Sequence, residues 1–492
     1  MRDSTPAVSS SRLGSLARTA VLVLLSAVLL QLMVSSRSAY LWSNIKNLRT
    51  PIQYHGEHIT SNFFEGWYFK FVKLNDNDKG QALGMALIPG IYLPPPDADQ
   101  NRAHAFVIVL GLPGREHSAY YRFPTEDFVD QGEHGAGQEG AFRVKIGNSV
   151  FAHDEIILDL PVENFDRIPA EELEMFYAEA SQQYAAQYRN SNSSQTRPVS
   201  DDFFRNFFPS SNQLKAQERQ EPFAVQGHFK FPANTQTVLP TSFLTPSIMG
   251  FTAYAPFLEC NHGVASLHHP IQKGRIATLN ANSEIQAEDV YDGGVGYTEK
   301  DWGINFPSTW IWIQSNIFSV SPGSSLLVSL ASIPVLGPDV SEWIHDHLPV
   351  ASSLTHVPGM LLVYYHAASK TVYNFSTYIL SAKTKSLKVT MDLEKRTQTV
   401  SLVATTPDPL RSGKTVALEV SVTREMGTGV PLRAPRREMG RMMTGVEETV
   451  LAQMRVKLWR VESGEVVVED VGLGGGLEVV GDIQWLEARV NS

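Results

Sequence analysis

Cysteine is almost absent from this chain of 492 residues, and the single one, Cys260, excludes an intrachain disulfide. Basic residues are also few, with 41 Lys and Arg against 51 Asp and Glu and a formal net charge of −10. Residues 1–48 carry five basic residues and Asp3, a net +4, so −14 falls on the remainder. A body this acidic does not suit binding to a polyphosphate, and we expect no nucleic-acid partner.

Several widespread functional motifs are missing as well. The chain has no G-x-S-x-G sequence and no P-loop, and its glycine-rich segment 472–477 lacks the last glycine of a dinucleotide fingerprint, which predicts a turn there. The pairs His55/His58 and His345/His347 have spacing that suits a metal, but neither has a convincing third ligand. We therefore predict neither a metal nor a cofactor.

Long apolar runs are missing apart from one near the N-terminus. Residues 20–34 are apolar except for Ser26 and Gln31, and basic residues flank them. Extended to about 16–36, the segment approaches the roughly 20 residues of a membrane span. We predict a single uncleaved membrane anchor with its basic end cytosolic and the body on the lumenal side of the secretory pathway. A cleaved secretory signal and an organellar presequence are the alternatives.

The rest of the sequence is typical of β-strands. Short segments rich in β-branched and aromatic residues, such as 64–72 and 309–320, recur between turn residues, which indicates barrels or sandwiches. The exceptions are a helix expected at 169–188 and a long loop expected at 424–446. The length predicts more than one domain. We expect a leader over 1–48, a first β domain over 49–265 with an insertion at about 165–220, and a second over 266–492.

Two stretches place polar groups beside large aromatic rings. Alternation along a strand puts Glu65 and Trp67 on one face of the segment 64–72. In the segment 309–320 the same alternation sets an isoleucine face, typical of core, against a face that carries Trp310, Trp312, Gln314 and Asn316. Two indoles followed by two amides favour a pocket wall. Amides that pair with the backbone of a barrel are the alternative.

Glu299 and Asp301 precede Trp302 at a spacing of two, which predicts one shared face with Lys300 on the other. One reading is a turn in which Asp301 caps backbone amides. The other is a general acid, because burial among apolar groups raises the pKa of a carboxyl group. In a third segment, Glu259 and His262 form either an acid/base pair or a satisfied polar pair at the rim of a barrel.

At these residues the chain resembles the tocopherol cyclase family. The similar blocks are F-F-E-G-W-Y at 63–68, P-x-x-E-C-x-H-G-V at 256–264 and G-Y-x-E-K-D-W-G-x-x-F-P-x-x-W-x-W at 296–312, followed by Gln314 and Asn316. The resemblance covers roughly residues 50–485. It implies an all-β architecture of two lipocalin-like antiparallel barrel or sandwich domains, here with an N-terminal hydrophobic helix and a short helical insertion.

The resemblance also implies an activity: closure of a chroman ring on a prenylated quinol, with no redox cofactor or metal. A general acid protonates the alkene of the tail, and the phenolic oxygen traps the cation. From residue chemistry we expect Glu299 or Asp301 to donate the proton, with Glu65 next. The substrate-binding residues expected are Trp67, Trp302, Trp310, Trp312, Gln314, Asn316, Glu259 and His262. A non-catalytic carrier of a hydrophobic ligand, or a membrane-tethered interaction module, are the alternatives.

Overall fold

The computed structural model of the chain describes residues 50–75, 78–115, 118–132, 142–191, 220–232, 237–240, 242, 245–255, 258–334, 355–379 and 381–492. The predicted leader with its anchor, the part of the insertion after residue 191 and the His345/His347 pair lie outside these ranges. No helix within them is long and apolar enough to span a bilayer. The membrane anchor and the lumenal location remain predictions.

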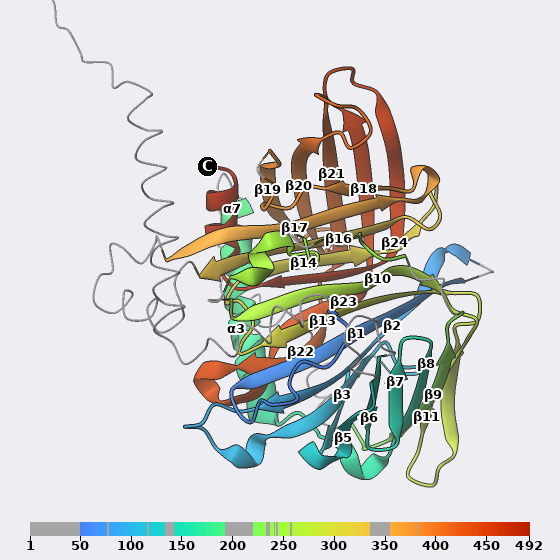
Figure 1. Ribbon diagram of the computed structural model, residues 1–492. Helices are drawn as coiled ribbons and strands as arrows, with labels where there is room; N and C mark the ends of the chain where they lie inside the picture. The colour runs from blue at the N-terminus through green and yellow to red at the C-terminus, as the bar shows by residue number, and fades with distance from the viewer. Residues whose placement is uncertain are drawn as a thin grey trace, which may run out of the picture.

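Three antiparallel sheets are stacked in the molecule (Figure 1). The middle sheet has six strands in the order β10 (Cys260–Pro270), β13 (Val295–Gly303), β1 (Phe63–Asn75), β2 (Asp78–Leu93), β3 (His104–Leu110) and β4 (Ala119–Phe123). Both faces of this sheet are covered, so its strands are apolar on both sides, as in β3, where every residue is buried.

The second sheet lies below the first in Figure 1 and has seven strands. Their order is β12 (Ile285–Val290), β11 (Lys273–Leu279), β9 (Ala224–Lys230), β8 (Glu155–Leu160), β7 (Ser149–Ala152), β6 (Arg143–Ile146) and β5 (Phe128–Asp130). Between it and the middle sheet lies an aromatic core that includes Trp67, Phe69, Phe71 and Phe229. Phe71 and Phe229 stack with ring centroids 4.4 Å apart.

The third sheet has 11 strands and lies above the middle one. Its main path is β18 (Thr371–Asn374), β17 (His356–His366), β16 (Ser325–Pro334), β14 (Trp310–Ser315), β24 (Val466–Val480), β23 (Arg441–Arg460), β21 (Thr415–Glu425), β20 (Thr397–Pro407) and β19 (Lys383–Asp392); β15 (Ile317–Phe318) pairs with β24 and β22 (Val430–Arg436) with β23. The sheet bends strongly, so that β20 and β21 stand across the direction of β14 and β16 (Figure 1). One face encloses its own core, which includes Ile311 and Ile313.

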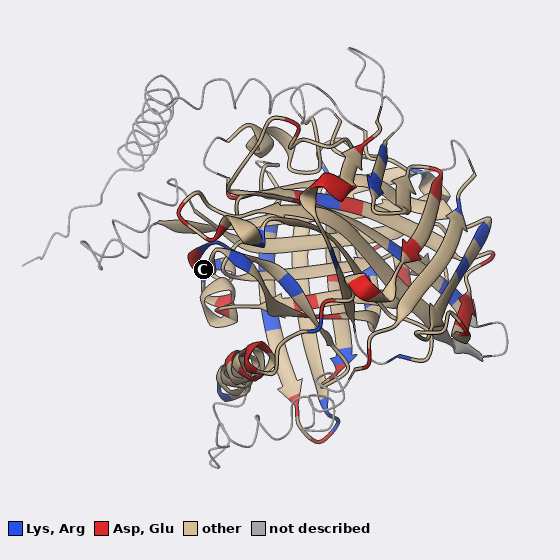
Figure 2. Ribbon diagram, turned by 90° about the horizontal axis from the view of Figure 1, so that it is seen from below, with Lys and Arg blue, Asp and Glu red and all other residues tan. Residues whose placement is uncertain are grey.

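Two α-helices complete the described structure. The predicted helix of the insertion is α3 (Ala170–Ser191), which packs against β19, β23 and α7 (Ile483–Val490). Short 3-10 helices are η1 (Gln100–Arg102), η2 (Thr125–Asp127), η3 (Val162–Asn164), η4 (Gly250–Tyr254), η6 (Ala367–Ser369) and η7 (Arg437–Met439). Acidic and basic residues are interspersed along the strands and loops (Figure 2).

The all-β prediction with a helical insertion is confirmed, and of the barrel and sandwich alternatives the open sheets support the sandwich. Each sheet keeps two edge strands, and none closes on itself within the described part of the chain. The predicted domain boundary at 265 falls inside β10, which pairs with β13, and β13 pairs with β1. The division into domains therefore remains a prediction.

Two expected irregular segments are strands. Residues 424–446, predicted as a long loop, contain β22 and the start of β23, and the predicted turn at 472–477 lies inside β24. Glycines run through this strand because its neighbours approach closely. A Cβ on Gly476 would lie 2.3 Å from the Trp312 ring, and one on Gly475 would lie 2.7 Å from the Ala452 carbonyl oxygen. Close packing accounts for Gly475 and Gly476, whereas Gly474 has a left-handed backbone with φ +58°.

Gly476→Ala should therefore lower the melting temperature, because the new methyl group must displace the Trp312 ring at an overpacking cost of about 1–3 kcal/mol. Differential scanning fluorimetry measures the change. Gly66→Ala is the matched control, since the nearest atom to its added Cβ lies 3.7 Å away. Equal melting temperatures for Gly476→Ala and the wild type would contradict this packing.

Candidate functional site

A cavity of about 750 Å³ lies between the middle sheet and the 11-stranded sheet. Its wall is largely apolar and includes Phe64, Ile88 and Phe106 from one sheet and Trp310, Trp312 and Met360 from the other. A volume of this size suits an organic ligand. A second hollow, between α3 and the strands β23 and β24, holds only about 20 Å³.

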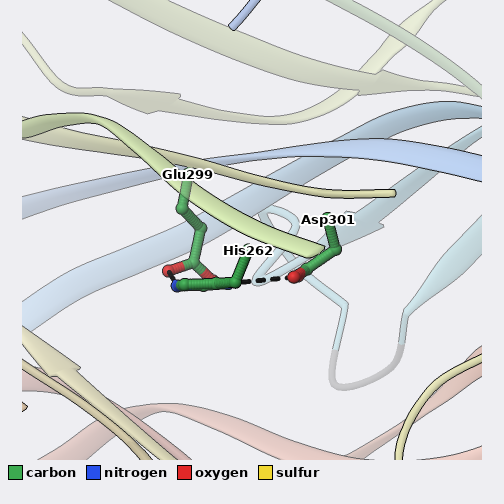
Figure 3. Close-up of side chains that lie close together, drawn as sticks. All are labelled: His262, Glu299 and Asp301. Atoms are coloured by element: carbon green, nitrogen blue, oxygen red, sulfur yellow. Dashed lines mark hydrogen bonds and ion pairs between the residues drawn. The ribbon is translucent and has the colours of Figure 1, made fainter. Parts of the chain in front are cut away.

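His262, Glu299 and Asp301 form a polar group on the wall of this cavity (Figure 3). The strand register brings these three side chains together. His262 on β10 is the direct partner of Asp301 on β13, and Glu299, two residues before Asp301, lies on the same face of β13. His262 Nδ1 lies 2.9 Å from Asp301 Oδ1, and His262 Nε2 lies 3.5 Å from Glu299 Oε2. The spacing of two in the sequence thus places both acids beside one imidazole.

Glu299 is buried and is held by two aromatic donors. Its Oε2 accepts hydrogen bonds from the Tyr297 hydroxyl group and from Trp312 Nε1, the latter at 3.2 Å. Burial, with a smaller contribution from Asp301, raises the pKa of Glu299 to about 7 against the lowering effect of His262. A carboxyl group with this pKa carries a proton for much of the time near neutral pH.

The two neighbouring acids favour the charged form of His262. Burial alone would lower its pKa, but Asp301 and Glu299 raise the pKa to about 9. One ligand atom from each of the three residues falls within 4.8 Å of the others, a spacing that also suits a metal ion. A protonated imidazole offers no lone pair, and a metal would have to displace that proton and the hydrogen bond to Asp301. The donor set therefore fits an ion-pair network better than a metal centre.

Two further acids line the same cavity, and sequence reasoning missed both. Glu448 on β23 and Glu478 on β24 are direct partners across the two strands. Tyr68 donates its hydroxyl hydrogen to Glu448 Oε1 at 2.5 Å, and Trp310 Nε1 donates to Glu478 Oε2 at 2.6 Å. Burial raises the pKa of Glu448 to about 7, and that of Glu478 is raised well above its usual value.

A signal for Glu448 was present in the sequence. It continues an inward-facing alternation through Met442, Thr444 and Val446 to Val450, so it is an acid at a core position of a strand. The expectation of a loop ending at 446 concealed that alternation. Glu478 was hidden by the glycines that precede it.

The four predicted residues of β14 and its continuation divide into two pairs. Trp310 and Trp312 line the cavity, whereas Gln314 and Asn316 are not among the lining residues. Gln314 Oε1 accepts from Lys70 Nζ at 2.8 Å, and Asn316 Nδ2 donates to the Gly296 carbonyl oxygen at 2.8 Å. The amides join the third sheet to the middle one.

The side chains of Glu65, Trp67 and Trp302 do not face the cavity. None of these three residues contributes to the cavity wall. Glu65 forms a fully buried ion pair with Lys300, whose Nζ lies over the rings of Trp67 and Trp302 at 5.1 and 4.9 Å. Burial raises the pKa of Glu65 to about 7, which Lys300 partly offsets. The arrangement is that of a buried structural ion pair.

The predicted pairing of Glu259 with His262 is not what the structure shows. His262 contacts Asp301 and Glu299 instead. Glu259 lies in a bend just before β10, whereas His262 lies inside that strand. Burial raises the pKa of Glu259, whose carbonyl oxygen accepts from Ile304 and Asn305. Cys260 lines the cavity, and burial raises the pKa of its thiol well above the usual value.

Comparison with known sequences assigns the family. Residues 169–481 match the family described as tocopherol cyclase-like. The chain belongs to the tocopherol cyclase-like family. A probable chloroplastic tocopherol cyclase of Oryza sativa subsp. japonica is 21% identical over 201 residues, and a chloroplastic tocopherol cyclase of Zea mays is 22% identical over 201. These matches cover 39% of this chain and 34% of each plant protein, so the chain spans about a third of the length of these relatives.

Solved structures of similar shape include the protein CghA with Sch210972 and the kievitone hydratase of Nectria haematococca. CghA aligns with a TM-score of 0.40 and 9% identity over 85% of this chain and 89% of its own. The kievitone hydratase aligns with a TM-score of 0.34 and 9% identity over 89% of this chain and 92% of its own. The fold of this tocopherol cyclase-like protein is defined by its own strand pairing.

Lys300→Met should destabilise the protein by about 3–5 kcal/mol, because it leaves Glu65 buried without its cation. Glu65→Gln with Lys300→Met should recover part of the loss, since glutamine still accepts from the His55 backbone N–H, which lies 3.0 Å from Glu65 Oε2. Melting temperatures of the three proteins test this. A Lys300→Met protein as stable as the wild type would show that the pair contributes nothing.

Proposed function

We propose that the protein is an enzyme that closes a ring on an apolar substrate carrying a prenyl tail and a phenolic hydroxyl group. The observation that supports this most directly is a buried carboxyl group with a raised pKa, Glu299, on the wall of a largely apolar cavity. Membership of the tocopherol cyclase-like family agrees with it. The substrate class comes from that family and from the shape and polarity of the cavity.

The reaction begins with Glu299. Its carboxyl group gives a proton to one carbon of the tail alkene, and the other carbon becomes a tertiary cation. The faces of Trp310 and Trp312, which border the cavity, stabilise a passing cation. The wall is largely apolar, which limits the water that can quench the cation. The phenolic oxygen then bonds to the cationic carbon and loses its proton to the protein.

His262 and Asp301 restore the proton donor. Asp301 fixes the imidazole through Nδ1, which leaves Nε2 directed at Glu299. After Glu299 has given up its proton, the imidazolium ion can replace it and then recover a proton from the product side. The sequence of steps moves protons and forms one C–O bond with no net oxidation, so it calls for no redox cofactor.

A carrier of a hydrophobic ligand is the second candidate, and the apolar lining of the cavity favours it equally. The two candidates differ in what the acids do. In a carrier the carboxyl groups only brace the sheets, and their replacement changes stability without changing any reaction.

Glu299→Gln should abolish ring closure while ligand binding is retained, because the amide keeps the hydrogen bonds to Tyr297 and Trp312 but has no proton of suitable acidity. The loss should be on the order of 10²–10⁴-fold, as for removal of a general acid. Purified protein is incubated in D₂O with a prenylated hydroquinone, and mass spectrometry measures product and deuterium in the tail. Binding is followed by quenching of tryptophan fluorescence.

Glu419→Gln, an exposed glutamate of β21, is the control for the substitution itself. Turnover by Glu299→Gln at the wild-type rate would remove Glu299 from the mechanism. Tight binding by the wild type with no product from a series of prenylated phenols would favour the carrier.

The rate of ring closure should fall as the pH rises above about 7. The pKa of Glu299 is raised to about 7, so the protonated, donating form is present below this pH and is lost above it. His262, with a pKa near 9, stays charged over the same interval. A profile of kcat/KM between pH 5 and 9, with ligand affinity measured at each pH, checks this. A rate that keeps increasing above pH 7 is the contrary result.

A further inference from the structure

The cavity has a second polar group that the protonation step does not use. Glu448 and Glu478 face each other on adjacent strands, and both line the cavity. Glu448 is fully buried, whereas Glu478 is partly exposed. Glu448 raises the pKa of Glu478, because like charges in an apolar site repel.

Glu448 has one oxygen held and one oxygen left over. Oε1 accepts the hydrogen bond from Tyr68, while Oε2 is buried and has no hydrogen-bond partner among the described residues. A buried acceptor without a donor is costly and rare in folded proteins. Because Glu448 lines the cavity, a ligand hydroxyl group can supply the missing donor.

We propose that Glu448 binds the acidic hydroxyl group of the substrate through Oε2 and accepts its proton as the C–O bond forms. This rests on the ring-closing function proposed above and names the base of that reaction. The ligand class is a phenol or hydroquinone with an apolar tail. Glu448 ends the step protonated, and the proton count balances, since one proton enters at the alkene and one leaves from the hydroxyl group.

The acid and the base lie on either side of two aromatic rings. Tyr68 is the strand partner of Glu299 on β13, yet its hydroxyl group reaches Glu448. Trp312 donates to Glu299 and is the strand partner of Glu478. The rings of Tyr68 and Trp312 meet edge to face with centroids 5.2 Å apart. The proton donor Glu299 and the proton acceptor Glu448 are thus separate groups, connected through the contact between the Tyr68 and Trp312 rings.

The surroundings of Glu448 agree with a base. The charged or titratable groups that act on it are Tyr68 and Lys70 of β1, Glu299 of β13 and Glu478 of β24. Lys70 favours its ionised form, and burial opposes that form, which leaves the pKa of Glu448 at about 7. A base with this pKa accepts a proton from a hydroxyl group that becomes strongly acidic once its oxygen bonds to a cation.

The test compares a prenylated hydroquinone with its dimethyl ether, which has the same tail and ring but no hydroxyl hydrogen. Quenching of tryptophan fluorescence gives both affinities. The wild type should bind the free hydroquinone about tenfold more tightly or better, as expected for a hydrogen bond to a charged acceptor. Glu448→Gln should lose most of this preference, and Glu419→Gln should keep it.

Turnover separates the base from the acid. In D₂O, Glu448→Gln should form ring product on the order of 100-fold more slowly. It should still place deuterium in the tail of the recovered substrate, because Glu299 can protonate the alkene and take a proton back. Glu299→Gln should lose both signals. Should Glu448→Gln not fold, Tyr68→Phe removes the hydrogen bond that lowers the pKa of Glu448, so less of the ionised acceptor is present and the preference for the free hydroquinone should fall.

Equal preference in Glu448→Gln and the wild type overturns the proposal, as does a wild type that does not distinguish the two ligands. Ring closure by Glu448→Gln at the wild-type rate overturns the role as base. A preference that depends on Glu448 without any turnover by the wild type supports the hydroxyl site and removes the proposed ring closure. Failure of the hydroxyl site at Glu448 is therefore distinguishable from failure of the proposed ring closure.

Discussion

Four carboxyl groups face one largely apolar cavity, and the cost of ionising them together governs the rest of the site. Glu299, Asp301, Glu448 and Glu478 come from only three strands, and the basic side chains near them include His262, Arg433 and Lys70. Burial lowers the pKa of Lys70 to about 7. Charge balance leaves some of the acids protonated. Burial and mutual repulsion raise the pKa values of Glu299 and Glu478, and burial raises that of Glu448. Tyrosine O–H and tryptophan N–H groups hold these three acids in place.

The sheets supply this arrangement through register. The middle sheet is covered on both faces, with an aromatic core and the Glu65–Lys300 pair on one side and the cavity on the other. The alternation of side chains along β1 and β13 sorts ionisable groups between these layers. Groups of the structural pair satisfy each other, whereas groups that face the cavity have unused hydrogen-bonding atoms, such as Glu448 Oε2. One face of the middle sheet therefore carries the structural ion pair, and the other carries the candidate reactive groups.

Much of this could be predicted from the sequence, because alternation is a local property. The shared face of Glu299 and Asp301, and the contrast between the tryptophan and isoleucine faces of β14, follow from a period of two. The sequence does not indicate which face of β1 lines the cavity, because both faces are buried and aromatic. The prediction of Glu65 and Trp67 as site residues is wrong for this reason. The third layer was also hidden, because sheet stacking depends on contacts between distant segments.

The cavity acids of the C-terminal strands β23 and β24 were not predicted, for a different reason. Glycines in β24 indicated a turn, yet they serve the close approach of Trp312 and neighbouring strands. That error concealed Glu478 and, with the expected loop before it, Glu448.

Infrared difference spectroscopy at pH 7, between the wild type and a protein carrying Glu299→Gln and Glu448→Gln, tests the protonation of the cavity acids most directly. The account predicts that the wild type shows absorption from protonated carboxyl groups that the variant lacks. A difference spectrum with only ionised carboxylate bands would contradict it.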